Sequence, residues 1–165
     1  MEDDDIWIED HTVIVGSIAW YDYSGRWKQD HRSLLQIEAS KKLYNNDGNY
    51  IHWNRSDLSF AKDCLQRFTK RLEILEQDEK VSRIIVVTHV PLFEETIVYP
   101  FPGPGNAYFY NLTFGDYVLD HAHKVTDVIS GHTHLGVDCY VQGIHRTIHC
   151  QVCGSDYGFP AIVVI

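Results

Sequence analysis

Hydrophobic residues in this chain gather in short runs separated by polar, proline-rich and glycine-rich segments. Residues 12–18 and 83–88 are rich in apolar, β-branched side chains, which is typical of buried strands. In 83–88 the apolar run is continuous, as in a sheet covered on both faces. Further strands are expected at 125–130, near 136–141, at 144–149 and at 161–165.

One long segment has the spacing of an amphipathic helix. Over residues 57–79 apolar positions recur three and four apart, and they form one stripe suited to lie on a sheet. Ser56 or Asp57 can cap the start of this helix. A short helix is expected within 31–44 and another over 115–124, whereas residues 45–49 predict a turn.

The order of these elements predicts an α/β protein with mixed sheets and flanking helices, in a single domain over residues 1–165. Residues 92–113 interrupt the pattern with prolines, glycines and aromatic residues, which exclude a helix or a central strand. A loop of this length is often functional. Its rings either stack on a base or sugar of a substrate or pack on one another. The candidate substrate-binding residues are Tyr99, Phe101, Tyr108 and Tyr110.

Charge and cysteine content narrow the possible functions. The formal net charge of −9 argues against binding nucleic acid through surface charge. The chain lacks an apolar run of about 18 residues and begins with an acidic segment, so we expect no membrane span, no signal peptide and a cytoplasmic location. Cys150 and Cys153 form a single C-x-x-C pair, which favours structural thiols over a zinc or redox site.

Two histidine phrases follow predicted strands. The first is Thr88-His89-Val90-Pro91, and the second contains Gly131, His132, Thr133 and His134. Loops at strand ends are where α/β sheets bind ligands. If the second phrase is extended, its two imidazoles project to the same side and could serve two metal ions. The alternative is that all three histidines are bonded to the backbone.

Together with Gly16-Ser17 near the N-terminus, these phrases resemble the C-terminal half of a calcineurin-like metallophosphoesterase. The resemblance implies a layered αββα sandwich, here incomplete, and hydrolysis of phosphomonoesters or phosphodiesters by metal-activated water. It also implies that His89 and His132 bind the second of two metal ions and that His134 binds the first. The ions would be manganese, iron or zinc.

The N-terminal motifs of that family are absent, because the sequence contains neither Asp-x-His nor Asn-His. Without a bridging carboxylate, two dications about 4 Å apart repel by about 4 kcal/mol for each product of unit charges at an effective dielectric of 20. We therefore expect at most one weakly bound ion and little activity from this chain alone. We also expect open sheet edges, which either a homo-oligomer would cover or a missing N-terminal half would have covered. The alternatives are a non-catalytic binding scaffold and an inert fragment that oligomerises.

Overall fold

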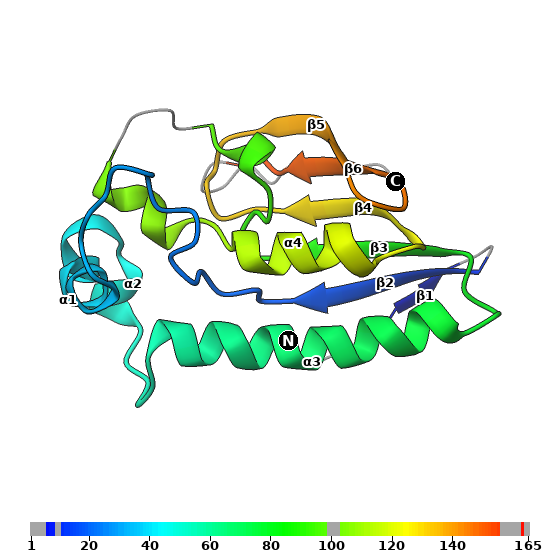
Figure 1. Ribbon diagram of the computed structural model, residues 1–165, viewed down its shortest axis with the longest axis horizontal. Helices are drawn as coiled ribbons and strands as arrows, with labels where there is room; N and C mark the ends of the chain where they lie inside the picture. Colours follow the sequence, from blue (N-terminus) through cyan, green and yellow to red (C-terminus); the bar gives the residue numbers. More distant parts are fainter. Residues whose placement is uncertain (1–5, 9–10, 99–102, 156–162, 164–165) are drawn as a thin grey trace.

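A computed structural model describes residues 6–8, 11–98, 103–155 and 163. Among these residues, six strands form one mixed sheet in the order β1-β2-β3-β4-β6-β5 (Figure 1). The inner strands β2, β3, β4 and β6 run parallel, while β1 and β5 lie antiparallel at the two edges. The strands are β1 (Ile6–Ile8), β2 (Thr12–Ser17), β3 (Arg83–Thr88), β4 (Val125–Ser130), β5 (Val137–Gln142) and β6 (Thr147–Val152).

The long predicted helix is present as α3 (Asp57–Gln77), and the Ser56 side chain caps it by accepting a hydrogen bond from the Ser59 amide at 3.2 Å. A second helix, α4 (Leu112–His121), is capped by Asn111, whose side chain accepts from the Phe114 amide at 2.8 Å. The remaining helical segments are α1 (Leu34–Tyr44), α2 (Asp47–Tyr50), η1 (Glu94–Thr96) and η2 (Pro104–Tyr108).

Helices α3 and α4 cover the same face of the sheet (Figure 1). Their buried side chains, such as Phe68 and Phe114 with ring centroids 4.4 Å apart, join the core formed by Val13, Ile84 and Val128 of the strands. Val13 of β2 is paired with Ile84 of β3, and Val128 of β4 is paired with Val86 of β3. Because Ile84 and Val86 are two residues apart in β3, all of these side chains point to one side of the sheet. Burial of this one continuous apolar cluster holds the sheet and its helices together.

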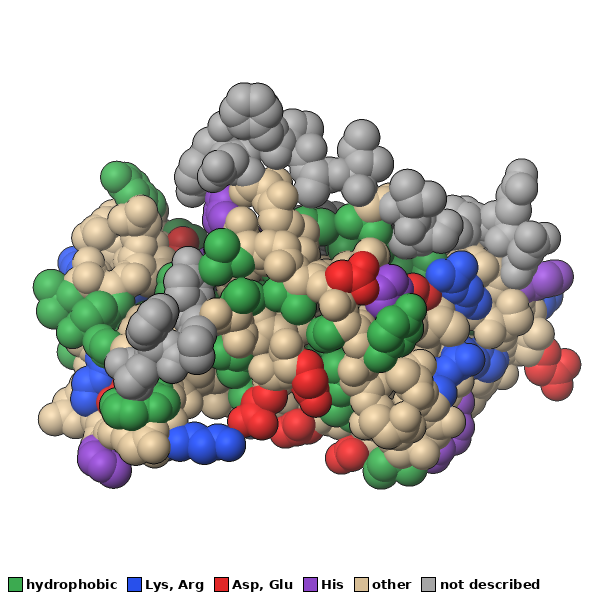
Figure 2. All heavy atoms as spheres, turned by 90° about the horizontal axis from the view of Figure 1, so that it is seen from above, with side chains coloured by type: hydrophobic (Ala, Val, Ile, Leu, Met, Phe, Trp, Pro, Cys, Tyr) green, Lys and Arg blue, Asp and Glu red, His purple; other side chains and the backbone are tan. Residues whose placement is uncertain are grey.

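The opposite face carries a row of polar side chains across four strands. Arg83 is ion-paired with Asp127 at 2.7 Å, and His149 lies 3.4 Å from Asp127 and 2.8 Å from Asp138. Figure 2 shows acidic, histidine and basic side chains next to one another on the molecule seen from above. Strands β3, β4, β6 and β5 are therefore linked on this face by charge and hydrogen bonding.

The predicted α/β class with a mixed sheet and flanking helices is confirmed, and the strand predicted over 83–88 is β3 to the residue. The turn predicted over 45–49 is instead occupied largely by α2, and the helix expected from residue 115 starts three residues earlier. The strand expected over 161–165 lies outside the described residues apart from residue 163. None of the helices within the described residues is long and apolar enough to cross a membrane.

Candidate functional site

The site lies where β3 and β4 end. His89 follows β3 directly, and Gly131 and His132 follow β4, which is the parallel neighbour of β3. The Gly131 amide donates a hydrogen bond to the His89 carbonyl at 3.1 Å, which ties the two strand ends together. As a result the His89 and His132 rings lie with their centroids 4.6 Å apart. The structure thus brings together two histidines that are 43 residues apart in the sequence (132 − 89).

The backbone of the second phrase is not extended. His132 and His134 have φ angles of 66° and 59°, in the left-handed region that side chains other than glycine rarely adopt. The expectation that the two imidazoles project together from an extended segment is therefore wrong. His134 still lines the same pocket as His89 and His132, because the chain turns twice rather than running straight. Gly131 is not required for space, since a Cβ there would meet its nearest neighbour, the His89 carbonyl oxygen, at 3.8 Å.

Backbone carbonyls fix the tautomers of two of the histidine rings. The Nε2 atom of His132 lies 3.1 Å from the Tyr108 carbonyl oxygen, and Nδ1 of His134 lies 2.7 Å from that of Ser155. A carbonyl oxygen can only accept, so each of these nitrogens carries the hydrogen. In the neutral ring the lone pair then lies on Nδ1 of His132 and on Nε2 of His134.

The pocket environment keeps His89 and His132 neutral. Loss of hydration lowers the pKa of both imidazoles from the ordinary value of 6.5, and the neighbouring histidines lower it further. The Asp47 carboxylate acts in the opposite direction, because its negative charge raises the pKa of both rings. The net direction is downward, so both rings are uncharged at neutral pH and can accept a proton.

The three histidines form one wall of a pocket of about 640 Å³. The facing wall comes from the end of α1 and from α2, which lie beyond the carboxyl ends of the parallel strands (Figure 1). Sequence reasoning missed this wall because a polar run resembling a turn gave no sign of facing the histidines. Its pocket-lining residues are Lys42, Leu43, Tyr44, Asn45, Asn46 and Asp47.

Residues 103–111 support the pocket from behind. Tyr108 and Tyr110, both named as substrate-binding candidates, are fully buried, whereas Phe109 between them lines the pocket. The Tyr108 hydroxyl donates to the Ile37 carbonyl of α1 at 2.6 Å, while its own carbonyl holds His132. Tyr99 and Phe101 lie outside the described residues.

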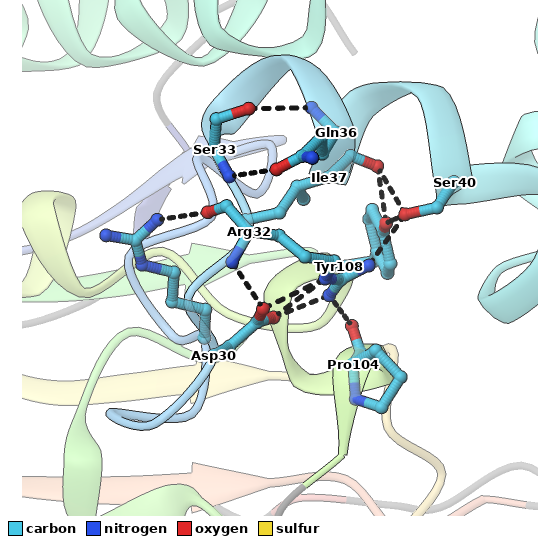
Figure 3. A network of polar contacts seen from close by, with 9 residues as sticks. Asp30, Arg32, Ser33, Gln36, Ile37, Ser40, Pro104 and Tyr108 are labelled. Atoms are coloured by element: carbon cyan, nitrogen blue, oxygen red, sulfur yellow. Dashed lines mark hydrogen bonds and ion pairs between the residues drawn. The ribbon is translucent and has the colours of Figure 1, made fainter.

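A second set of contacts joins the same loop to α1 (Figure 3). Arg32 is ion-paired with Asp30 at 2.6 Å and donates to the Pro104 carbonyl at 3.0 Å and to Ser40 at 2.6 Å. Asp30 holds the Arg32 guanidinium through a fork of hydrogen bonds, and that bonding lowers the pKa of the Asp30 carboxyl. The end of the loop is thereby fixed against α1, next to the pocket.

The described residues do not form a metal centre. Nowhere in residues 6–8, 11–98, 103–155 and 163 do three or more His, Cys, Asp or Glu side chains converge on a point that could hold an ion. Nε2 of His132 and Nδ1 of His134 donate to backbone carbonyls, as the second nitrogen of a metal-bound histidine commonly does, so the opposite nitrogen of each ring keeps its lone pair. The metal-binding roles that the resemblance implies for His89, His132 and His134 stay a prediction. The expectation of at most one weakly bound ion stays a prediction.

The cysteines show no disulfide among the described residues, and all four are free. Cys150 is buried in β6, and burial raises the pKa of its thiol. A raised pKa disfavours the reactive thiolate. Cys153 lines the pocket, but desolvation raises its pKa as well.

Comparison with known proteins gives one informative likeness. No protein-family model matches the chain, and no curated protein matches it. In structure the chain is similar to a phosphopantetheinyl hydrolase from Mycobacterium tuberculosis, with a TM-score of 0.66 and 17% sequence identity. The match covers 92% of this chain and 52% of the other, so the chain spans about half the length of that solved structure. At this identity the likeness concerns the fold.

These findings contradict the family predicted from the sequence. The assignment to calcineurin-like metallophosphoesterases and the function of a metal-dependent phosphoesterase are wrong, because the family models give no match and the matching structure is a phosphopantetheinyl hydrolase. The physical reason lies in what the histidine phrases encode. Loops at the carboxyl edge of a parallel sheet carry polar side chains in many unrelated proteins. Two histidine phrases at strand ends therefore indicate such an edge and do not identify one family.

Proposed function

We propose that this chain forms the substrate-binding part of a hydrolase that acts on a molecule carrying a phosphopantetheinyl group. The observation that carries the proposal is the pocket of about 640 Å³ at the carboxyl edge of the parallel strands, lined by His89, His132 and His134. A site of this size suits a small-molecule group. The fold it shares with a phosphopantetheinyl hydrolase supports the choice of substrate group.

His132 is our choice for the base that activates water. Its Nε2–H is fixed on the Tyr108 carbonyl at 3.1 Å, so the lone pair of Nδ1 is held in one orientation. Its lowered pKa keeps the ring ready to accept a proton at neutral pH. His89, 4.6 Å away between ring centroids, is placed to share or relay that proton. Lys42 lies on the opposite wall and would attract the anionic end of the substrate.

Backbone strain supports a functional role for this edge. His132, His134, Ala19 and Tyr23 adopt positive φ angles of 66°, 59°, 40° and 67°. Non-glycine residues in this region cost about 1–2 kcal/mol each. Such strain is found most often where a site demands a particular geometry. All four residues follow the end of β2 or of β4 by no more than six positions.

We further propose a layered αββα arrangement. The described strands form one sheet whose first face is covered by α3 and α4. On the second face Ile85 is fully buried although it stands outside the main apolar cluster. That burial supports further packing on this face.

Coenzyme A tests the proposed function, because it is a small molecule that contains the phosphopantetheinyl group. The chain is incubated with coenzyme A, and products are followed by mass spectrometry for release of a phosphopantetheine-containing fragment. We expect His132→Asn to lower the rate of product formation by about 10²-fold or more, as for loss of a general base.

His145→Asn is the matched control, because His145 is exposed in the β5–β6 turn, where its ring stacks on His123. It is expected to retain the full rate. Hydrolysis that survives His132→Asn unchanged would reject His132 as the base. Failure of coenzyme A both to react and to shift the amide resonances of the pocket would reject the proposed substrate group.

A further inference from the structure

A buried carboxylate lies behind the pocket. Asp57 is the first residue of α3, and only 1% of it is exposed. It accepts hydrogen bonds from the Trp20 indole at 2.8 Å, from the Tyr23 hydroxyl at 2.6 Å and from the Lys41 ammonium at 2.8 and 2.9 Å. An acidic residue in the first turn of a helix is stabilised by the helix dipole even when it stays in water. Capping therefore does not explain why Asp57 is buried.

The partners of Asp57 come from a helix that lines the pocket and from the stretch that follows β2. Trp20 and Tyr23 belong to the stretch that follows β2, and Lys41 belongs to α1. A buried carboxylate needs such partners, because an unpaired one is strongly disfavoured. The ion pair between Lys41 and Asp57 therefore fixes α1 against the strand end and against the start of α3.

Tyr21 connects this cluster to the pocket wall. Its ring is fully buried, the Lys41 ammonium lies 5.7 Å from the ring centroid, and its hydroxyl donates to the Asp47 carboxylate at 3.2 Å. Burial and the nearby Asp57 carboxylate raise the pKa of Tyr21, so the hydroxyl stays protonated and remains a donor. The Tyr21 ring also stacks with the His132 ring, with centroids 6.2 Å apart.

From this geometry we propose that Asp57 is a positioning residue which, through Lys41 and Tyr21, holds Asp47 on the α1–α2 wall facing the pocket histidines. The proposal rests on the proposed function for its catalytic meaning. Its structural content is that the Asp47 carboxylate is held from inside the fold by the buried Tyr21. Asp57 does not touch the pocket, and it acts only through the residues it binds.

Two variants break the connection at different points. Tyr21→Phe removes the hydroxyl that binds Asp47 and leaves the Asp57 cluster intact, whereas Lys41→Met removes the cation of the buried pair. Lys41→Arg restores the charge and the donors. Arg55→Met is the matched control, because Arg55 forms an exposed ion pair with Asp63 of α3 and packs over the Phe60 ring. Neither of these contacts includes Asp57, Lys41 or Tyr21. Thermal unfolding shows which variants are folded.

The first measurement is amide hydrogen exchange over Asp47–Tyr50. We expect exchange in α2 at least about tenfold faster in Tyr21→Phe and in folded Lys41→Met, as for loss of a hydrogen bond to a charged group. Exchange in β3 and β4 is expected to stay unchanged, as is exchange throughout Arg55→Met. Lys41→Arg is expected to return α2 to the wild-type rate. Unchanged α2 exchange in Tyr21→Phe, the variant that keeps the core intact, would overturn the proposal.

The second measurement is a double-mutant cycle on coenzyme A affinity. If Tyr21 acts through Asp47, Tyr21→Phe weakens binding in the wild-type background but adds nothing to Asp47→Ala. Additive losses would mean that Tyr21 has only a general structural role, and they would also overturn the proposal. A wild-type chain that does not bind coenzyme A refutes the proposed function, while the exchange rates still decide the positioning role.

Discussion

Replacing Gly115 by alanine perturbs the contact between α4 and the loop that follows His89. A Cβ at position 115 would lie 2.0 Å from the Leu92 carbonyl oxygen and 2.9 Å from the Leu92 carbonyl carbon. Both are backbone atoms, so no side-chain rotation can relieve the clash. The helix or the loop must move, and the loop carries His89 three residues before Leu92.

Two effects of Gly115→Ala oppose each other. Alanine in a helix is more favourable than glycine by about 1 kcal/mol. Overpacking in a tight contact typically costs about 1–3 kcal/mol and occasionally more. A contact of 2.0 Å against backbone belongs at the upper end of that range. We therefore expect Gly115→Ala to lower the free energy of unfolding by about 2 kcal/mol or more.

Urea unfolding followed by circular dichroism measures this change as a shift of the midpoint at constant slope. Gly105→Ala is the matched control, because a Cβ there would meet its nearest atom, in the Phe109 ring, at an ordinary 3.6 Å. The control is expected to stay within about 0.5 kcal/mol of the wild type. A Gly115→Ala chain as stable as the wild type would refute the reasoning, since propensity would then have outweighed the clash.

Four other outcomes are expected. The hydrogen bond to Asp138 raises the pKa of His149 above 6.5. Protonated His149 therefore stabilises the fold below about pH 6.5, and this contribution is lost as the pH rises through the raised pKa. An NMR titration in which Asp138→Asn does not lower the pKa of His149 would contradict this. Hydrolysis is expected to fall on the acid side with an apparent pKa below 6.5, as His132 becomes protonated, and a pH–rate profile that is flat there would argue against His132. Calorimetry with manganese or zinc is expected to find at most one weakly bound ion, and two tight sites would disprove this. Light scattering across concentrations is expected to show a homo-oligomer, and a clean monomer would count against it.

The elements that the sequence predicted well are those whose pattern is local. The three-and-four spacing of α3 and the continuous apolar run of β3 each depend on neighbouring residues and on burial in one core. The start of α4 was misplaced, because Gly115 suggested a beginning although the side-chain cap is Asn111. In α4 the glycine serves a close approach to Leu92, and a sequence pattern does not show such a tertiary contact.

The candidate site was predicted only in part, for a similar reason. Strand-end position identified His89, His132 and His134, and all three line one pocket. The residues opposite them come from α1 and α2, which reach the pocket only because Tyr108, Arg32 and the buried Asp57 fix them there. Those contacts join segments far apart in the sequence. The wrong family followed from reading one wall of the pocket as if it specified the whole.

Strain and buried charge at the carboxyl edge belong to one arrangement. Tyr23 has a φ angle of 67°, and its hydroxyl donates to Asp57 at 2.6 Å, so a costly backbone conformation coincides with a strong hydrogen bond to a buried carboxylate. The strained His132 likewise forms a bond to the Tyr108 carbonyl, and Tyr108 is itself anchored on α1. The sheet itself does not require a strained residue at either position, because glycine would adopt a positive φ angle there at a lower cost in free energy. The bond that offsets the strain of His132 lies at the pocket, and the bond that offsets the strain of Tyr23 lies behind it, so both support the fixed orientation that the pocket histidines require.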